Sequence, residues 1–256
     1  MHRLVTISVS HYCEKARWAL DLAGEPYTED GHLPLLHWRA SFGVGGRRTV
    51  PVLVPDDGPV LPDSTDILRW LDARHPHLGL FGDTDANRAE IARWEDHFDR
   101  KLGPDARRWA YYHLLPNKAV LLDFASQQVP TWERRMMDAC YPLAAAMLRR
   151  ALTVTDAGLA RSLVRIQAAL DEVGAALADG RRYLVGDRLS AADLTYATLV
   201  APLVAPPEYP TPLPVDRLPA PMSADIARYR ATAAGAYALR LYREERRGRR
   251  LLTGTG

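Results

Sequence analysis

The sequence predicts a small α/β domain followed by a larger all-α domain. A short β-branched run at 4–9 leads directly into a helical pattern, as expected for a strand and the helix after it. A second group of short apolar runs, at 49–61, again ends at a helix start. Beyond residue 85 only helical spacing recurs. Strands confined to the first third of the chain favour two structural units of different class.

The first unit begins with a strand, a turn and a helix. Residues 4–9 predict a buried strand. From Glu14 the apolar residues recur at helical spacing, and Gly24 supplies a C-terminal stop. A second strand is predicted near 26–28, which completes a βαβ order.

A hairpin and a second helix are predicted next. The apolar runs 49–54 and 59–61 flank the turn 55–58, which contains Pro, Asp and Gly and therefore predicts a hairpin. Either Asp63 or Ser64 is expected to cap the helix that follows, because both residue types accept hydrogen bonds from free backbone N–H groups. The order βαβ then ββα completes the first unit.

The second unit is predicted to be helical throughout. Residues 76–85 carry Gly, Pro and Asp without a period and suit a linker, so the predicted domains are 1–75 and 86–256. Helical spacing recurs in five segments: 86–113, 118–150, 155–179, 190–204 and 223–247.

Two segments of the helical unit have unusual composition. Eight prolines between Pro202 and Pro221 predict an extended loop, since proline cannot continue a helix or a central strand. The basic tail 240–250 is predicted to be a solvated helix end.

Composition excludes several classes of protein. The 33 basic and 31 acidic residues leave a net charge of +2, which argues against a nucleic-acid partner. Two cysteines cannot form a secreted disulfide framework and favour a reducing cytoplasm. No run approaches the roughly 20 apolar residues of a membrane span, and the N-terminus does not resemble a signal peptide.

Four short motifs occur in a fixed order: Ser10-His11-Tyr12-Cys13, Val50-Pro51, Asp63-Ser64, and the capping-box-like pair Ser190 and Asp193. With these motifs the chain resembles the glutathione transferase superfamily, and in particular cytosolic bacterial members of the serine type. The resemblance implies a thioredoxin-like first domain, a helical-bundle second domain and a homodimer. It also implies detoxifying conjugation with glutathione as co-substrate and no metal.

The resemblance assigns residues to the binding of glutathione. Val50-Pro51 corresponds to the cis-proline step, where Val50 offers its backbone to the cysteinyl part. Asp63-Ser64 corresponds to the pair that holds the γ-glutamyl group at a helix N-terminus, where carboxylates are stabilised. Both assignments are implied by the family.

The glycyl end of the thiol lacks a clear counterpart. Relatives often carry an Asn-Pro-x-Gly-Lys-like run before the Val-Pro step, whereas this chain has a glycine- and arginine-rich loop at 42–49. Arg48 is the expected substitute for the missing base, with Arg47 and Arg39 as alternatives. Arginine supplies nearly all of the basic residues, a bias typical of GC-rich genomes, and some bacteria with such genomes use another low-molecular-weight thiol, which is an alternative to glutathione.

Ser10 occupies the catalytic position of the family's serine class. A thiol with a pKa near 8.5 is only about 3% ionised at pH 7, so a hydroxyl that stabilises the thiolate supplies more nucleophile. Tyr12 and Ser8 are alternative hydroxyls. Cys13 is either inert packing or a reactive thiol at a helix start.

The resemblance also implies an acceptor pocket between the domains, lined by His11, Tyr12 and the aromatic residues Trp109, Tyr111 and Tyr112. Aromatic residues at helical spacing also suit a core. Ser190 and Asp193 are expected to be structural.

Two alternatives to a conjugating transferase follow from the same motifs. A glutathione-dependent thioltransferase or peroxidase would require Cys13 or the bound thiol to form disulfides. A non-catalytic binding protein would keep only the fold, which hosts all of these functions.

Overall fold

The first domain is built on a sheet of three strands in the order β2-β1-β3. The computed structural model describes residues 1–246. Strand β1 (His2–Ile7) pairs in parallel with β2 (Tyr27–His32) and antiparallel with β3 (Val52–Val54). The central strand is buried because both faces of the sheet are covered, and Leu4 is fully buried within it. The predicted α/β class of this unit is confirmed.

The predicted hairpin is reduced to a single bridge. Leu53 and Leu61 exchange two backbone hydrogen bonds of 2.9 Å, and no further ladder forms among the described residues of this turn. The expected strand at 59–61 is therefore wrong, because Pro59 and Pro62 have no N–H to donate.

Three helices accompany the sheet: α1 (His11–Ala23), α2 (His37–Gly43) and α3 (Ser64–Arg74). Helix α1 ends at Gly24, whose φ of 69° is the left-handed conformation that glycine adopts without strain. Asp63 caps α3 by accepting the Thr65 N–H at 2.8 Å, which decides between the two expected caps. Helix α2 was not predicted.

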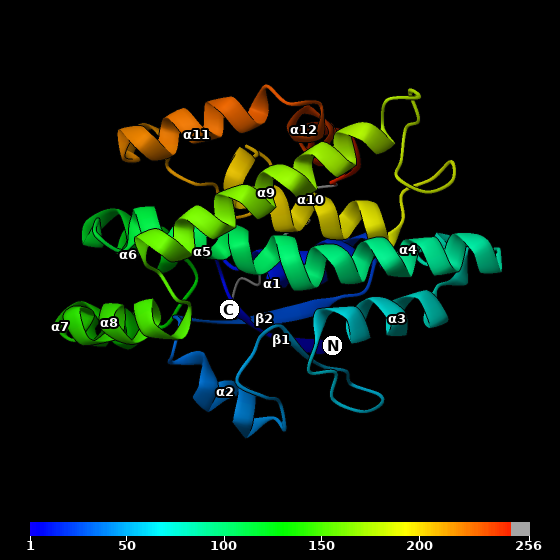
Figure 1. Ribbon diagram of the computed structural model, residues 1–256. Helices are drawn as coiled ribbons and strands as arrows, with labels where there is room; N and C mark the ends of the chain where they lie inside the picture. The colour runs from blue at the N-terminus through cyan, green and yellow to red at the C-terminus, as the bar shows by residue number, and fades with distance from the viewer. Residues whose placement is uncertain (247–256) are drawn as a thin grey trace.

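The rest of the described chain, up to residue 246, contains helices and no strand, which confirms the predicted all-α unit. A short 3₁₀ turn η1 (Pro76–Leu78) precedes α4 (Asp85–His97), a π-helical turn η2 (Phe98–Leu102) and α5 (Gly103–Leu114), which run on without a loop. The long helix α9 (Asp156–Ala176) packs against α5. In Figure 1 these helices stack over α1 and the sheet, and α2 lies at the opposite end of the molecule.

Two predicted helices are divided. Segment 118–150 forms α6 (Lys118–Ala125), α7 (Thr131–Ala139) and α8 (Tyr141–Ala151), because Pro130 and Pro142 start new helices. Segment 223–247 forms α11 (Ala220–Arg230) and α12 (Ala233–Glu245), because Thr232 caps α12 through the Gly235 N–H at 2.9 Å.

Helix α10 (Ala191–Val204) is the buried centre of the helical domain and packs against α1. The capping box formed by Ser190 and Asp193 is present at its N-terminus. The Asp193 carboxylate accepts hydrogen bonds from the Ser190 N–H at 2.8 Å, the Leu184 N–H at 2.7 Å and the Tyr237 hydroxyl. Three segments, namely the start of α10, the loop at Leu184 and helix α12, are thus joined at one buried carboxylate.

The proline-rich segment crosses back to the first domain. Pro202 still lies inside α10, and the chain leaves the helix at Ala205. Tyr209 donates to the Val9 carbonyl at 3.3 Å, and Thr211 donates to the Ser8 carbonyl at 3.2 Å. A 3₁₀ turn, η3 (Val215–Arg217), then leads to α11.

Buried ion pairs also join the two domains. Lys15 on α1 contacts Glu95 on α4 and Asp99 in η2. Arg246 donates to Glu14 at 2.7 Å and to Asp21 at 2.8 Å, both on α1, and its side chain is buried. The prediction of a solvated tail is therefore wrong at Arg246, and residues 247–250 lie outside the described part.

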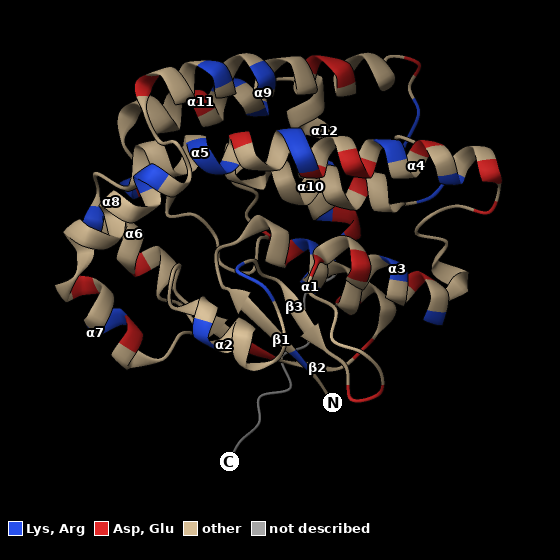
Figure 2. Ribbon diagram, turned by 60° about the horizontal axis from the view of Figure 1, so that its bottom comes forward, with Lys and Arg blue, Asp and Glu red and all other residues tan. Residues whose placement is uncertain are grey.

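The described helices include none that combines the length and the apolar character of a membrane span. Figure 2 shows both acidic and basic residues along α4 and along α9, in keeping with a net charge near zero.

Candidate functional site

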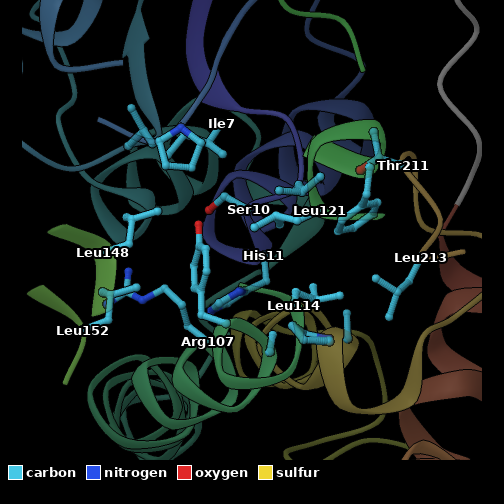
Figure 3. Close-up of a pocket in the computed structure, with 18 of the residues that line it drawn as sticks. Ile7, Ser10, His11, Arg107, Leu114, Leu121, Leu148, Leu152, Thr211 and Leu213 are labelled. Atoms are coloured by element: carbon cyan, nitrogen blue, oxygen red, sulfur yellow. The ribbon is translucent and has the colours of Figure 1, made fainter. Parts of the chain in front are cut away.

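A cavity of about 260 Å³ lies between the two domains (Figure 3). One side, here called the N-terminal wall, comes from the first domain and consists of Ile7, Val9, Ser10, His11, Pro34, Leu35, His37, Trp38, Arg48, Thr49 and Val50. The C-terminal wall comes from the helical domain and consists of Arg107, Ala110, Tyr111, Leu114, Leu121, Phe124, Leu148, Ala151, Leu152, Ala201, Pro202, Ala205, Pro206, Tyr209, Thr211, Leu213 and Met222. Most of these side chains are apolar, so the cavity suits an apolar ligand with a few polar anchors.

Ser10 lies on the N-terminal wall as the N-cap of α1. Its Oγ accepts a hydrogen bond from the Cys13 N–H at 3.4 Å, and no described residue accepts a hydrogen bond from its hydroxyl. The hydroxyl proton is therefore available to a ligand. Because Ser10 stands at the positive end of a helix, an anion beside it is stabilised further.

The Val50-Pro51 peptide bond is cis, as the resemblance implies. Val50 lines the cavity together with Arg48. The Arg48 carbonyl accepts from His37 Nε2 at 3.0 Å and from Trp38 Nε1 at 3.1 Å, which fixes the backbone of this loop. The exposed Arg48 guanidinium lies over the Trp38 ring, 5.7 Å from its centroid.

Asp63 and Ser64 lie at the N-terminus of α3 and do not line this cavity. Asp63 is exposed, and Ser64 is buried. Their neighbour Thr65 accepts a hydrogen bond from Lys15 Nζ at 3.2 Å and donates to Glu95 at 2.5 Å. The N-terminus of α3 is thereby held beside the Lys15 cluster, outside the apolar part of the cavity.

His11 lines the cavity, whereas Tyr12 does not. The Tyr12 hydroxyl donates to the Asp99 carbonyl at 2.7 Å, and burial raises the pKa of that hydroxyl. His11 Nε2 lies 3.2 Å from the Gly103 carbonyl. Burial, followed by the charge of Arg107, lowers the pKa of His11 to about 3, so the ring is neutral near pH 7.

Cys13 is fully buried and does not line the cavity. Its Sγ accepts a hydrogen bond from the Ile7 N–H at 3.5 Å, and burial raises its pKa to about 11. A thiol with this pKa is almost entirely protonated at neutral pH, which suits packing and not nucleophilic chemistry.

The structure places Trp109 and Tyr112 away from the cavity. Trp109 is fully buried and donates to Asp225 at 3.0 Å, and Tyr112 donates to Asp156 at 2.7 Å. Of the three aromatic residues expected there, only Tyr111 lines the cavity, and the same face of α5 adds Arg107, Ala110 and Leu114. Spacings of three and four residues place these four side chains on one face of a helix, so helical periodicity predicts that they lie together.

One group of described side chains could together hold a metal ion, namely His2, Asp56 and Asp57. None of the three lines the cavity. His2 Nδ1 lies 2.5 Å from Asp56, and the N-terminal amine lies 3.0 Å from the same carboxylate. This group therefore has no connection with the candidate site.

Comparison with protein families matches both parts of the chain. The model of the glutathione S-transferase N-terminal domain matches residues 4–79, and that of the glutathione S-transferase C-terminal domain matches residues 156–221. The chain belongs to the glutathione S-transferase superfamily, and its first domain is the thioredoxin-like domain of that fold. No curated protein matches the chain.

Three similar solved structures have low sequence identity to this chain. A glutathione S-transferase from Methylobacterium radiotolerans, in complex with glutathione sulfonate, is 24% identical with a TM-score of 0.51, over 93% of this chain and 94% of that one. One from Rhodospirillum rubrum F11 is 22% identical with a TM-score of 0.58, over 96% and 93%. A glutathione transferase from Populus trichocarpa is 13% identical with a TM-score of 0.55, over 95% and 99%. These similarities concern the fold.

Proposed function

We propose that the protein is a glutathione transferase that conjugates the thiol of glutathione to an apolar electrophile. The observation that carries this proposal is the Ser10 hydroxyl, which lies on the cavity at the N-terminus of α1 with its proton uncommitted among the described residues. A hydroxyl that donates to the sulfur stabilises the thiolate, because a charge-assisted hydrogen bond is stronger than a neutral one. Ser10 is thus the proposed activating residue.

The proposed reaction is a displacement or addition at carbon. The glutathione thiol loses its proton to solvent, and the thiolate attacks the electrophilic carbon held against the C-terminal wall. A carbon–sulfur bond forms, and with an aryl halide the carbon–halogen bond breaks and halide leaves. Neutral His11 and buried Cys13 have no covalent part in this step.

The proposed thiol site extends from Ser10 to the start of α3. The Val50 backbone would hold the cysteinyl part and Arg48 the glycyl carboxylate. Asp63 and Ser64 would hold the γ-glutamyl group at the helix N-terminus, where backbone N–H groups favour a carboxylate. The glutathione sulfonate complex of the Methylobacterium protein supports glutathione as the thiol.

The test is conjugation of glutathione to 1-chloro-2,4-dinitrobenzene by wild type, Ser10→Ala and Tyr12→Phe. Ser10→Ala should lower kcat/KM about 100-fold, because it removes one donor to a developing anion. The matched hydroxyl deletion Tyr12→Phe should keep kcat/KM within a few-fold, because its hydroxyl is bound to Asp99 outside the cavity. The pKa of bound thiol, measured by thiolate absorbance, should rise only in Ser10→Ala. Equal rates in wild type and Ser10→Ala would remove Ser10 from this role.

Glutathione binding is measured separately by calorimetry. Wild type should bind, and both Asp63→Ala and Ser64→Ala should weaken binding, since each loses a partner of the γ-glutamyl group. Absence of binding by a folded wild-type protein would overturn glutathione as the thiol. Binding without any turnover would point to the non-catalytic alternative.

We further propose a cytoplasmic homodimer with domains at 1–75 and 86–256. Family membership supports these expectations, and the gap between α3 and α4 supports the boundaries. Light scattering tests the dimer, and limited proteolysis at 76–85 tests the boundaries.

A further inference from the structure

Arg107 is a half-buried cation on the C-terminal wall of the cavity. Its guanidinium lies 5.8 Å from the centroid of the Tyr12 ring and has no hydrogen bond or ion pair with residues 1–246. Every other described arginine that is not exposed has at least one such partner; these are Arg17, Arg108, Arg188, Arg230, Arg240 and Arg246. Arg107 is thus exceptional among the partly or fully buried arginines of the described chain.

The adjacent Arg108 shows how a structural arginine is hydrogen-bonded in this fold. Arg108 donates to the Leu152 carbonyl at 2.9 Å, to Ser162 at 2.6 Å and to Asp105 at 2.5 Å. A partly desolvated guanidinium is costly without such partners. The donors of Arg107 therefore remain available to a ligand inside the cavity.

No charged residue of the described chain that lines the cavity pairs with Arg107 or shares its wall. No Asp or Glu of the described chain lines the cavity. His11 is neutral near pH 7, and Arg107 itself contributes to the lowering of its pKa, after burial. The other lining cation, Arg48, is exposed over Trp38 on the N-terminal wall and belongs to the proposed thiol site. An anionic group bound at the C-terminal wall would therefore interact with the Arg107 guanidinium.

We propose that Arg107 binds a carboxylate of the acceptor substrate, so that the substrate class is an electrophile with an apolar body and an acidic group. This inference rests on the proposed function and names the substrate class of the same site. A guanidinium and a carboxylate match as two parallel hydrogen bonds, which fixes orientation as well as affinity. In Figure 3, Arg107 extends from α5 toward the side where Leu148 and Leu152 lie, and Ser10 enters from another element. The acid would lie at Arg107 and the electrophilic carbon nearer Ser10.

The test compares two acceptors that differ only in charge, 4-chloro-3,5-dinitrobenzoate and its methyl ester. In both, the thiolate attacks the chlorinated carbon, the carbon–sulfur bond forms and chloride leaves. Wild type should prefer the acid in kcat/KM. Arg107→Gln should lower kcat/KM for the acid about 10- to 100-fold, the range expected for a lost hydrogen bond to a charged group, and should change the ester less than about 3-fold.

Two further variants separate charge from geometry. Arg107→Lys keeps the charge without the planar fork and should retain part of the preference for the acid. Arg149→Gln removes a positive charge from the exposed surface of α8, outside the cavity, and should behave as wild type with both acceptors. Calorimetry with glutathione should give the same affinity for wild type and Arg107→Gln.

The outcomes distinguish this inference from the proposed function. Equal losses for acid and ester in Arg107→Gln, or a lost affinity for glutathione, would overturn carboxylate recognition while conjugation stands. If wild type converts neither acceptor, conjugation fails, and calorimetry with unreactive 3,5-dinitrobenzoate and its methyl ester decides the inference. Arg107-dependent binding of the acid alone supports it, and equal binding of both by wild type and Arg107→Gln contradicts it.

Discussion

The two walls of the cavity are assembled in different ways. The N-terminal wall comes from three short segments, 7–11, 34–38 and 48–50, and the turn at the start of α1 places the Ser10 hydroxyl. The C-terminal wall gathers side chains from residue 107 to residue 222, drawn from α5, α6, α8, α10, α11 and the proline-rich segment. The segments of the N-terminal wall contain recognisable sequence motifs. The C-terminal wall is assembled from residues far apart in the chain and has no such motif. The residues of the proposed thiol site are thus predictable from the sequence, whereas the residues of the proposed acceptor site depend on packing.

The largest expected effect on stability comes from removing the buried ion pairs that join the two domains. Lys15 joins α1 to the helical domain through Asp99 at 2.9 Å and through Glu95, and its side chain is fully buried. Lys15→Met leaves the buried Glu95 and partly buried Asp99 carboxylates without their cation and should lower the free energy of unfolding by about 3–5 kcal/mol. Urea unfolding measures the loss.

Lys118→Met is the matched control for that change. It removes an exposed pair with Asp138, 2.8 Å apart, which contributes little in water. Similar losses of stability in both variants would mean that the buried cluster has no special part in joining the walls.

A smaller effect is expected from His11, which belongs to the N-terminal wall and contacts Gly103 of α5 at 3.2 Å. Burial lowers the pKa of His11 from 6.5 to about 3. Between pH 6.5 and pH 3 the His11 ring is therefore protonated in the unfolded chain and neutral in the folded chain. This contribution to stability is complete above pH 6.5 and is lost as the pH falls toward 3, with a slope of up to about 1.4 kcal/mol per pH unit.

The variant His11→Gln, which keeps a donor for the Gly103 carbonyl, should flatten that acid slope. Unfolding free energies from pH 7 to pH 4 measure the difference between the two proteins. Parallel curves for wild type and variant would contradict the buried, neutral state of His11.

The smallest expected effect is confined to the C-terminal wall. Leu148→Trp adds bulk where α8 lines the cavity, so it should raise KM for 1-chloro-2,4-dinitrobenzene about 10-fold without weakening glutathione binding. Leu143→Trp changes an exposed position of the same helix and should match wild type. A loss of glutathione affinity in Leu148→Trp would mean that the two walls do not divide the substrates in this way.

The fold was predictable to the level of class and element order, because strand and helix periods and caps are local properties. The predicted second hairpin strand at 59–61 does not form, and the predicted helices at 118–150 and 223–247 are each divided into shorter ones. Prolines and the Thr232 cap broke the ladder or the helix at positions where apolar spacing continued. Helix α2 was missed because it is short and sits in a loop with weak periodicity.

The candidate site was predictable in part. The cis Val50-Pro51 bond, the Asp63 cap and the capping box at Ser190 are present as expected. Trp109 and Tyr112 were chosen by residue type, and both side chains face other partners. Arg107 was not predicted, because helical spacing groups it with Ala110, Tyr111 and Leu114 but does not show which face of α5 meets the cavity.

The sequence by itself determined the α/β and all-α division, the order of most elements and the short motifs of the N-terminal wall, because each depends on neighbouring residues. Only the tertiary structure decided which face of α5 meets the cavity, that the proline-rich segment returns to Ser8 and Val9, and that Arg246 pairs with Glu14. These contacts join residues that are far apart in the chain, so their energies depend on how helices pack and not on any local pattern.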